Sequence, residues 1–452
     1  MRFLRFLVIP VLLAGADWPQ FRGPNGAGVA DDGVAFPVTF RTVWKAAVPE
    51  GLSSPAVVGT RVFVTGLEGE RFVLVALDRS TGKELWRRTV ERARAEPLHK
   101  LNHAASPSVA SDGTSVVAFF PDFGLAAYSV AGEERWRTPM GPFTNAYGMG
   151  VSPVIAQGKV ILIVDQSQGS YAAAFDLGNG EQVWKVARKE ALSGHSTPVV
   201  HGKWVLAPGS LRMEAYDIAT GRTAWGVDGL PAEMKSVPVV HGDLVLVHGF
   251  NTPENDAGKL LTIPLFAEAL KGFDKNGDGK LGKPEAPSTH VTSIWIYIDL
   301  DSNGSLDQGE WEQYARTMRA ENALLAYKIG GGLVWKFLRS IPQLPSPLVY
   351  RGVLYMINEG GVLTTLDPAT GKLHKQARLR GEADRYYASP VAADGKVYIT
   401  SHTGKVSVLK AGAEQELLAV NEVEEEVLAT PALVDGRVLI RTKGAVYCYG
   451  DK

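Results

Sequence analysis

Short apolar runs separated by glycine turns recur along this chain at a steady interval. Each unit contains a residue that is usually small, a proline, a short apolar run, a turn with glycine and a second β-rich run. Apolar runs of about four to eight residues between turn residues are typical of β-strands. The unit occurs eight times, beginning at Ser54, Ser106, Ser152, Thr197, Val237, Ser346, Ser389 and Thr430. The pattern therefore predicts eight successive β-hairpins.

A second hairpin follows most of these units, with aspartate and glycine flanking its turn and a tryptophan after it. The hairpin is complete at 76–86, 174–184 and 215–225, is shortened at 127–136, and lacks the tryptophan at 365–375. Aspartate can hydrogen-bond the turn backbone, and glycine takes the positive φ that other residues resist. Because the tryptophan falls at a fixed place on the next strand, we expect it to pack between neighbouring sheets.

Two hairpins give four strands per unit, and four-stranded units repeated about every 40 to 50 residues indicate a β-propeller. The sequence therefore predicts an all-β fold, an eight-bladed β-propeller. The eighth unit ends at 445–450 without a tryptophan strand, whereas 41–48 is a tryptophan strand with no unit before it. We expect this N-terminal strand to complete the last blade, which would leave no open sheet edge.

The fifth blade is interrupted by a long insertion. Pro238 and Pro347 are 109 residues apart, against 40 to 52 for the other neighbouring pairs of units. We place the insertion at 251–322, between propeller segments 41–250 and 323–452, with an N-terminal extension at 17–40. Surface loops accept such insertions because added length costs little closure entropy.

Two stretches of the insertion have the spacing of EF-hand calcium loops. Such a loop presents oxygen atoms from positions 1, 3, 5, 7 and 12, with glycine at position 6. The predicted ligands are Asp274, Asn276, Asp278, Lys280 (through its carbonyl) and Glu285 in the first loop, and Asp299, Asp301, Asn303, Ser305 and Glu310 in the second. The alternative is a pair of Asp/Asn/Gly turns that hold no metal.

Helices are expected before the first loop and after the second, where apolar residues recur at helical spacing. Leu281 and Leu306 both fall at position 8 of their loops, where paired loops form a short β contact. Only 13 residues separate the loops, too few for two full helices. This short linker argues against a switching sensor. In a secreted module we expect structural Ca²⁺ sites of weak affinity, on the order of 10⁻⁴ to 10⁻³ M.

Composition and the first residues indicate the compartment. Residues 1–16 combine a basic start, an apolar stretch and small residues, as a secretory signal peptide does. The formal net charge of −1 gives no reason to expect nucleic acid as a partner. We expect a monomeric periplasmic or extracellular protein with no transmembrane segment in the mature chain and no lipid-anchoring cysteine. The single cysteine, Cys448, excludes an internal disulfide and is expected to lie in a buried strand.

The eight units resemble the PQQ-like (pyrroloquinoline quinone) β-propeller repeat family, and the likeness runs from Trp44 to the C-terminus apart from the insertion. The segment 17–28, DWPQFRGPNGAG, looks like the start of secreted bacterial members that are similar to BamB, the propeller scaffold of outer-membrane β-barrel assembly. The family includes quinoprotein dehydrogenases as well as non-catalytic scaffolds, so the fold alone does not decide the function. The dehydrogenases typically hold calcium with ring residues beside a disulfide of adjacent cysteines, and a single cysteine cannot form that disulfide.

The loops that enter each proline-bearing strand should gather on one face around the propeller axis, where propeller ligands usually bind. Candidate residues for a polar, aromatic pocket able to hold a planar quinone or a peptide are His103, Tyr147, His195, Lys235, Arg385 and Tyr387. The alternative is that these are ordinary loop and capping residues. We find no nucleophile–base pair, and the Ser or Thr that recurs before proline in seven blades indicates architecture rather than catalysis.

The sequence thus favours a non-catalytic binding or scaffold protein of the cell envelope, with a protein partner and Ca²⁺ in the inserted loops. The other hypothesis is a PQQ- and calcium-dependent quinoprotein oxidoreductase. The first predicts partner capture without redox activity, and the second predicts bound quinone and oxidation of a substrate.

Overall fold

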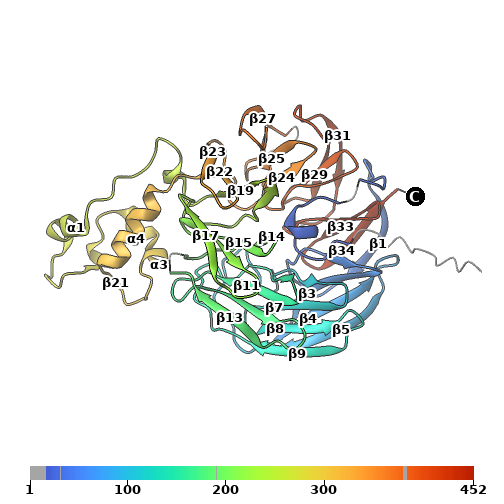
Figure 1. The fold of residues 1–452 in the computed structure, drawn as a ribbon, viewed down its shortest axis with the longest axis horizontal. Coiled ribbons are helices and arrows are strands. Elements are labelled where there is room, and N and C mark those ends of the chain that lie inside the picture. The colour runs from blue at the N-terminus through green and yellow to red at the C-terminus, as the bar shows by residue number, and fades with distance from the viewer. Residues whose placement is uncertain (1–16, 31, 190, 380–383, 452) are drawn as a thin grey trace, which may run out of the picture.

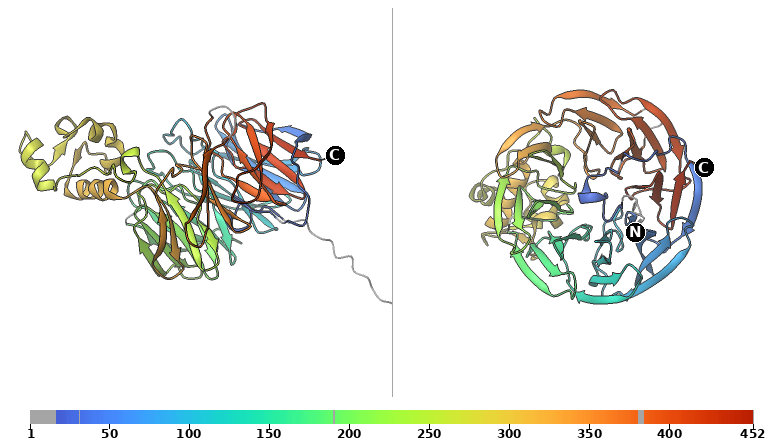
Figure 2. Two further views of the ribbon diagram at one scale, coloured as in Figure 1. Left: turned by 90° about the horizontal axis from the view of Figure 1, so that it is seen from above. Right: turned by 45° about the vertical axis from the view of Figure 1, so that its right-hand side comes forward.

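The eight predicted blades form a closed ring (Figure 2, right). The computed structural model describes residues 17–30, 32–189, 191–379 and 384–451, so the expected signal peptide at 1–16 lies outside the described residues. Eight sheets of four antiparallel strands follow one another around the axis, which confirms the predicted all-β, eight-bladed propeller. No helix in these described ranges has both the length and the apolar character needed to cross a membrane.

The blades follow the chain order. Blade one contains β2 (Ala56–Val58), β3 (Arg61–Glu68), β4 (Arg71–Asp78) and β5 (Glu84–Glu91), and blade two contains β6 (Ala110–Ser111), β7 (Ser115–Phe120), β8 (Gly124–Ser129) and β9 (Glu134–Pro139). Blade three contains β10 (Val154–Ala156), β11 (Lys159–Val164), β12 (Tyr171–Asp176) and β13 (Gln182–Ala187), and blade four contains β14 (Val199–His201), β15 (Trp204–Gly209), β16 (Arg212–Asp217) and β17 (Thr223–Asp228). Blade five contains β18 (Val239–His241), β19 (Leu244–Gly249), β22 (Ala323–Lys328) and β23 (Leu333–Phe337), and blade six contains β24 (Leu348–Tyr350), β25 (Val353–Ile357), β26 (Val362–Leu366) and β27 (Leu373–Arg378). Blade seven contains β28 (Val391–Ala393), β29 (Lys396–Thr400), β30 (Lys405–Lys410) and β31 (Leu417–Glu422), and blade eight contains β32 (Ala432–Val434), β33 (Arg437–Arg441), β34 (Ala445–Gly450) and β1 (Arg41–Ala47).

The ring closes between the two ends of the chain, as predicted. Strand β1 pairs antiparallel with β34, so that Trp44 lies opposite Cys448. Cys448 is buried, with 1% of its surface exposed, and this burial raises the pKa of its thiol to about 11. The last blade is therefore built from both ends of the chain.

Tryptophans hold neighbouring blades together, also as predicted. The Trp136 indole nitrogen of blade two donates to the Leu177 carbonyl of blade three at 2.8 Å, and Trp184 donates in the same way to Ile218 of blade four at 3.0 Å. Each such ring lies against a turn glycine of the next blade, where a Cβ would come within 2.5 to 2.8 Å of it; these glycines are Gly82, Gly132, Gly180, Gly221 and Gly371. Only glycine therefore leaves room for the tryptophan at these turns.

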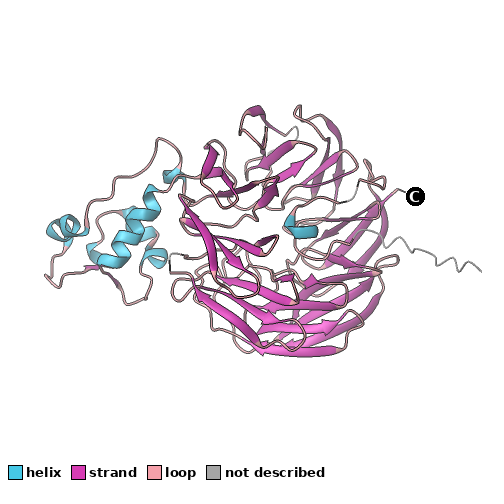
Figure 3. Ribbon diagram, viewed as in Figure 1, coloured by secondary structure: helices cyan, strands magenta, loops and turns pink. Residues whose placement is uncertain are grey.

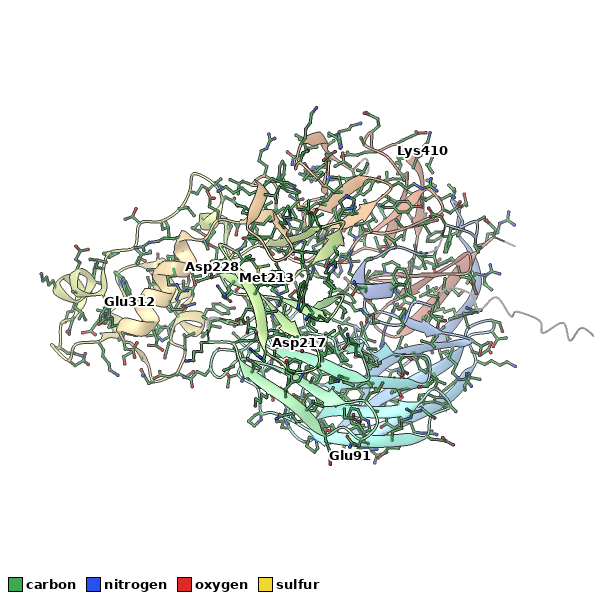
Figure 4. The ribbon with its side chains drawn as sticks, in the orientation of Figure 1. Glu91, Met213, Asp217, Asp228, Glu312 and Lys410 are labelled. Atoms are coloured by element: carbon green, nitrogen blue, oxygen red, sulfur yellow. The ribbon has the colours of Figure 1, made fainter. Side chains whose placement is uncertain are left out.

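The turn aspartates act as the sequence indicates. Asp217, at the end of β16 (Figure 4), accepts hydrogen bonds from the backbone N–H and the hydroxyl of Thr220, at 3.0 and 2.8 Å. Asp78 and Asp367 hold Thr81 and Thr370 in the same way. These bonds fix the loop that presents the glycine to the neighbouring tryptophan.

A belt of hydroxyl groups surrounds the axis at the start of the innermost strands. In seven places a backbone N–H donates to a serine or threonine hydroxyl of an adjacent blade, at 2.9 to 3.1 Å; the accepting residues are Ser54, Ser108, Ser152, Thr197, Ser346, Ser389 and Thr430. In blade two the belt residue is Ser108, two residues after the Ser106 that the repeat pattern selects. Ser106 instead accepts the N–H of His103 at 3.0 Å and belongs to the preceding loop.

The N-terminal extension crosses the ring near its centre, where the short blue element η1 (Pro24–Gly26) appears in Figure 1. Trp18 pairs with Val57 of blade one, Asn25 exchanges hydrogen bonds with Val200 of blade four, and the Ala30 N–H donates to Ala392 of blade seven. The Arg22 side chain is fully buried and donates to the Pro347 carbonyl of blade six at 2.7 Å. This segment therefore ties together blades that are far apart around the ring.

The helices gather in the insertion, which stands off from one side of the ring (Figures 2 and 3). Its elements are η2 (Pro253–Asn255), α1 (Phe266–Phe273), β20 (Leu281–Gly282), η3 (Lys283–Glu285), α2 (Thr289–Ser293), α3 (Trp295–Ile298), β21 (Ser305–Leu306) and α4 (Gln308–Arg319). They enclose a hydrophobic core of their own, which includes Trp295, Trp311 and Met318. Glu312 marks the exposed side of α4 in Figure 4.

Three asparagines join the first residues of the insertion to its last ones, next to blade five. The Asn322 amide oxygen accepts the Asn251 N–H at 2.8 Å, and its amide nitrogen donates to the Thr252 carbonyl at 2.7 Å. Asn255 donates to the carbonyls of Thr317 and Ala320 at the end of α4. Because Asn255 and Asn322 are fully buried and bonded, they close the base of the insertion where the chain leaves and re-enters blade five.

Candidate functional site

A cavity of about 1190 Å³ lies on the axis, on the face where the innermost strands begin. All seven belt residues line it: Ser54, Ser108, Ser152, Thr197, Ser346, Ser389 and Thr430. Phe21 of the N-terminal extension also lines the cavity. The cavity therefore occupies the centre of the ring, between the extension and the axial loops.

Five of the six predicted axial residues line this cavity: Tyr147, His195, Lys235, Arg385 and Tyr387. His103 does not line it. The Nδ1 atom of His103 accepts the Ala105 N–H at 3.1 Å, so the ring faces the backbone of its own loop. Burial, followed by the positive charges of Arg441 and Lys443, lowers the pKa of His103.

Tyr147 is the centre of an aromatic cluster on one side of the cavity. Its ring lies 5.8 Å from His195 and 5.7 Å from His99, both in edge-on contacts. Tyr297, from α3 of the insertion, stacks on Tyr147 with ring centroids 5.1 Å apart and an interplanar angle of 25°. The Tyr147 hydroxyl donates to Glu233 at 3.0 Å. The insertion thus supplies part of the wall of a cavity in the ring.

The charges beside this cluster are already paired. Lys235 forms an ion pair with Glu233 and lies 5.3 Å above the Tyr147 ring. Glu359 accepts the backbone N–H groups of Gln343 and Leu344 at 2.5 and 2.9 Å, and burial raises the pKa of its carboxyl group. These contacts leave little free charge on this side of the cavity.

Two titratable rings of the cluster, His195 and Tyr147, stay neutral near pH 7. Burial, aided by the charge of Lys235, lowers the pKa of His195 to about 3. Burial and the negative charge of Glu233 raise the pKa of Tyr147 far above its ordinary value. His195 and Tyr147 therefore offer aromatic faces and neutral hydrogen-bonding groups to a ligand, and neither is a general base poised near neutral pH.

The opposite side of the cavity carries Arg385 and Tyr387. The Arg385 guanidinium donates to the Tyr387 hydroxyl at 3.4 Å, which raises the pKa of Arg385, and Tyr387 meets His402 edge-on at 5.2 Å. Thr403 donates its hydroxyl to Asp384. A cationic and aromatic rim therefore faces the Tyr147 cluster.

The two predicted calcium loops lie in the insertion, and their short β contact is present. Leu281 pairs with Leu306 in the two-stranded sheet β20–β21. Gly279 and Gly304, at position 6 of each loop, have φ of +78° and +85°, as the tight turn requires. The linker between the loops contains two short helices, α2 and α3, in place of the full pair for which it is too short.

The carboxylates of the second loop converge. Asp299, Asp301 and Glu310 each place an oxygen atom within 4.8 Å of the others. Asp299 accepts the N–H groups of Asn303 and Gly304, both at 3.0 Å, and burial together with the charge of Asp301 raises the pKa of Glu310. Oxygen ligands at this spacing suit a hard divalent cation, which would relieve the repulsion between the carboxylates.

The first loop has the same internal bonding. Asp274 accepts the N–H groups of Gly277 and Gly279 at 2.7 and 3.1 Å. Glu285, at position 12, accepts the Lys275 and Gly282 N–H groups, both at 2.9 Å. The remaining predicted ligand Asn276 bonds to Asp278, and Lys280 donates its N–H to Asp278 at 2.9 Å, which leaves the Lys280 carbonyl for a cation.

A second cavity, of about 100 Å³, lies between the insertion and the ring. Tyr147 and Glu233 line it from the ring, and Tyr297, Glu310 and Met318 line it from the insertion. The second calcium loop therefore lies beside the aromatic cluster of the axial cavity, whereas no residue of the first loop lines either cavity.

Several site residues were missed by the sequence reasoning. His99 and Glu233 lie in the very loops that the repeat pattern singles out, so closer attention to all polar residues there would have included them. Tyr297 and Phe21 reach the cavity from the insertion and from the N-terminal extension. No periodicity signals such contacts, because they depend on how those segments fold back on the ring.

A family model described as "Outer membrane protein assembly factor BamB" matches residues 37–173, 168–263 and 302–452. Residues 264–301, which include the first calcium loop and the linker, are not matched. Among curated proteins, the outer membrane protein assembly factor BamB of Burkholderia pseudomallei (strain K96243) is 28% identical over 223 residues, or 46% of this chain and 53% of that protein. BamB of Yersinia pestis is 23% identical over 329 residues, or 68% of this chain and 75% of that protein. The chain thus spans about half the length of the Burkholderia relative.

Solved structures share the fold at low sequence identity. The crystal structure of BamB from Moraxella catarrhalis superposes with a TM-score of 0.60 at 14% identity, covering 92% of this chain and 98% of that one. A europium-containing methanol dehydrogenase superposes with a TM-score of 0.62 at 10% identity, covering 96% of this chain and 98% of that one. At these identities the structures show the propeller fold alone, which a scaffold protein and a dehydrogenase share.

Proposed function

Since this chain belongs to the family of the outer membrane protein assembly factor BamB, we propose that it is a non-catalytic protein-binding scaffold of the bacterial cell envelope. The family match across the ring carries this proposal. The expected signal peptide supports a location in the periplasm or outside the cell. Its partner is a protein of that compartment, and relatives named as assembly factors point to the outer-membrane assembly machinery.

The axial cavity supports a binding role. It presents the Tyr147 cluster on one side and the Arg385–Tyr387 rim on the other, with the belt hydroxyls between them. At about 1190 Å³ it exceeds the roughly 300 to 1,000 Å³ of an ordinary small-molecule pocket, so it can take several residues of a polypeptide. Aromatic rings and arginine are the groups that most often dominate the binding energy of protein interfaces.

Calcium binding by the inserted loops is part of the same proposal. The ligands are those predicted from the two loops, and the paired β20–β21 contact and the converging carboxylates of the second loop support it. Among the described residues, the cluster of carboxylates that could hold a metal ion is Asp299, Asp301 and Glu310 of the second loop.

A quinoprotein oxidoreductase is the second candidate, because the propeller superposes on a methanol dehydrogenase and the cavity could hold a planar quinone. The donor set around the cavity argues against it. Calcium beside a quinone needs free ring carboxylates, whereas Glu233 is paired with Lys235 and Glu359 with backbone N–H groups. The carboxylate cluster lies in the insertion instead.

Site-specific photo-crosslinking tests the scaffold proposal. A photo-reactive amino acid in place of Tyr387 should capture a defined envelope protein in cells that produce this chain. The same amino acid in place of Lys410, an exposed residue on the outer rim (Figure 4), is the matched control and should not. Equal capture from both positions, or none from Tyr387, would contradict binding at the axial face.

A further inference from the structure

The insertion contributes a residue to the axial cavity, and that residue adjoins the second calcium loop. Tyr297 lines the main cavity and stacks on Tyr147 of the ring at 5.1 Å. It is followed after one residue by Asp299, the first predicted ligand of the second loop. A change in that loop therefore acts directly on the helix that carries Tyr297.

Helix α3 and the second loop form one bonded unit. The Trp295 indole donates to the Asp299 carboxylate at 2.8 Å, and the Asp299 N–H donates back to the Trp295 carbonyl at 2.9 Å. The Leu300 N–H donates to the Glu310 carboxylate at 2.7 Å, which connects α3 to α4. Tyr297 thus lies in a turn whose position depends on the carboxylates that would bind the metal.

Helix α4, which a metal ion would connect to α3, is itself held in place at its end. The end of α4 is bonded to the first residues of the insertion by the buried side chains of Asn255 and Asn322, and β22 of blade five begins directly after Asn322. A cation between Asp299, Asp301 and Glu310 would link α3 to this fixed helix and remove the repulsion between three carboxylates within 4.8 Å. Metal binding should therefore order α3 against the ring.

We propose that the axial binding site is composite, with Tyr297 as a wall supplied by the insertion and calcium in the second loop holding that wall against Tyr147. The inference rests on the calcium binding and axial binding proposed above, and it adds their connection. The axial site is complete in the calcium-loaded protein, and loss of the metal loosens the Tyr147 side of the cavity.

Calcium itself is the probe in the test. Equilibrium dialysis first gives the number of calcium ions bound, and hydrogen exchange by mass spectrometry then follows the peptide covering residues 143–151, with calcium and with EDTA. We expect calcium to slow exchange in this peptide at least about fivefold, the lower end of the range for coupled sites. In Tyr297→Ala, which lacks the stacked ring, calcium should still bind but exchange at 143–151 should no longer respond.

Two further variants test whether the response needs the Tyr297 ring in particular and the metal in the second loop. Ile296→Ala removes a side chain that is 61% exposed on the same helix and should keep the full calcium response. Glu310→Gln should lose both calcium at the second loop and the response at 143–151. If the wild-type protein binds no calcium, both the calcium proposal and this inference fail. If it binds calcium but residues 143–151 do not respond, or Tyr297→Ala responds as the wild type does, calcium binding stands and the composite site is overturned.

Discussion

Hydroxyl groups at the start of the innermost strands join neighbouring blades at seven places around the axis. A hydrogen bond of this kind contributes about 1 kcal/mol net, while a buried N–H left without an acceptor costs about 1 to 3 kcal/mol. Blade five carries Val237 at this position, and a Cβ on Gly26 would lie 2.8 Å from its side chain. The valine thus packs under the N-terminal extension where other blades have a hydroxyl.

The recurrence of Ser and Thr before proline was enough to predict an architectural role, and the belt of hydrogen bonds confirms it. The pattern could not identify Ser108 as the belt residue of blade two, because valine replaces proline after it. The register of the strands determines which residue of blade two enters the belt, and this register depends on strand pairing that the sequence does not show.

A fully buried histidine makes the stability of the ring depend on pH. His248, in β19, is 0% exposed, and burial followed by the charge of Arg22 lowers its pKa to about 4, although its bond to the Pro345 carbonyl acts in the opposite direction. The unfolded chain, with a histidine pKa of about 6.5, binds more protons below that pH. The contribution of His248 to stability is therefore complete above about pH 6.5 and is lost as the pH falls toward the folded-state pKa.

We expect the free energy of unfolding to fall by about 2 kcal/mol between about pH 7 and pH 5 because of this one side chain. Urea unfolding of the wild type and of His248→Gln over that range measures the effect. The loss should be smaller by that amount in the variant. Parallel pH profiles for the two proteins would show that His248 does not titrate in this way.

Tryptophan–glycine contacts govern stability at the scale of the elements. Gly180 has φ of +75°, and a Cβ there would lie 2.5 Å from Trp136 of the preceding blade. Gly202 has a similar φ of +59° in a turn where an added Cβ would meet nothing within 4 Å. An alanine at either position would have the same unfavourable positive φ, but only at Gly180 would its Cβ clash with a tryptophan.

Gly202→Ala should cost about 1 kcal/mol, from the positive φ alone, whereas Gly180→Ala should cost about 2 to 4 kcal/mol, because the clash with Trp136 adds to that strain. Chemical denaturation of both variants measures the difference. Equal costs at the two turns would show that the indole moves aside easily and that it does not lock the blades together.

The elements of the insertion were largely predictable, whereas their contact with the ring was not. Helical spacing around Leu270 indicated α1, and the matched positions of Leu281 and Leu306 indicated the short β contact. The stacking of Tyr297 on Tyr147 joins residues 150 positions apart in the chain. Such a contact depends on how the insertion folds against the ring, and no local sequence pattern predicts it.

The whole molecule is closed twice, once by the pairing of β1 with β34 and again by the extension that crosses the centre. The first closure follows from an incomplete last blade and a lone tryptophan strand, so the sequence was sufficient to predict it. The second depends on the burial of Trp18 and Arg22 among several blades. The extension contains no copy of the repeat, so nothing in its sequence indicates such a position in advance.

The ring, its axial cavity and the paired charges in that cavity fit the protein-binding scaffold that we propose. The account predicts that the cavity does not serve as a quinone site. The carboxylates Glu233 and Glu359 are engaged by Lys235 and by backbone N–H groups, and the clustered carboxylates lie in the insertion.

Retention of PQQ tests this account most directly. The chain without residues 1–16 is mixed with PQQ and calcium at about 1 mM, enough to load weak extracellular calcium sites, and is then ultrafiltered. A double variant, Glu285→Ala with Glu310→Ala, is treated in the same way. We predict that neither protein retains PQQ. Stoichiometric retention by both would place the cofactor in the ring, and retention by the wild type alone would make it depend on the inserted loops. Either result would contradict a non-catalytic scaffold.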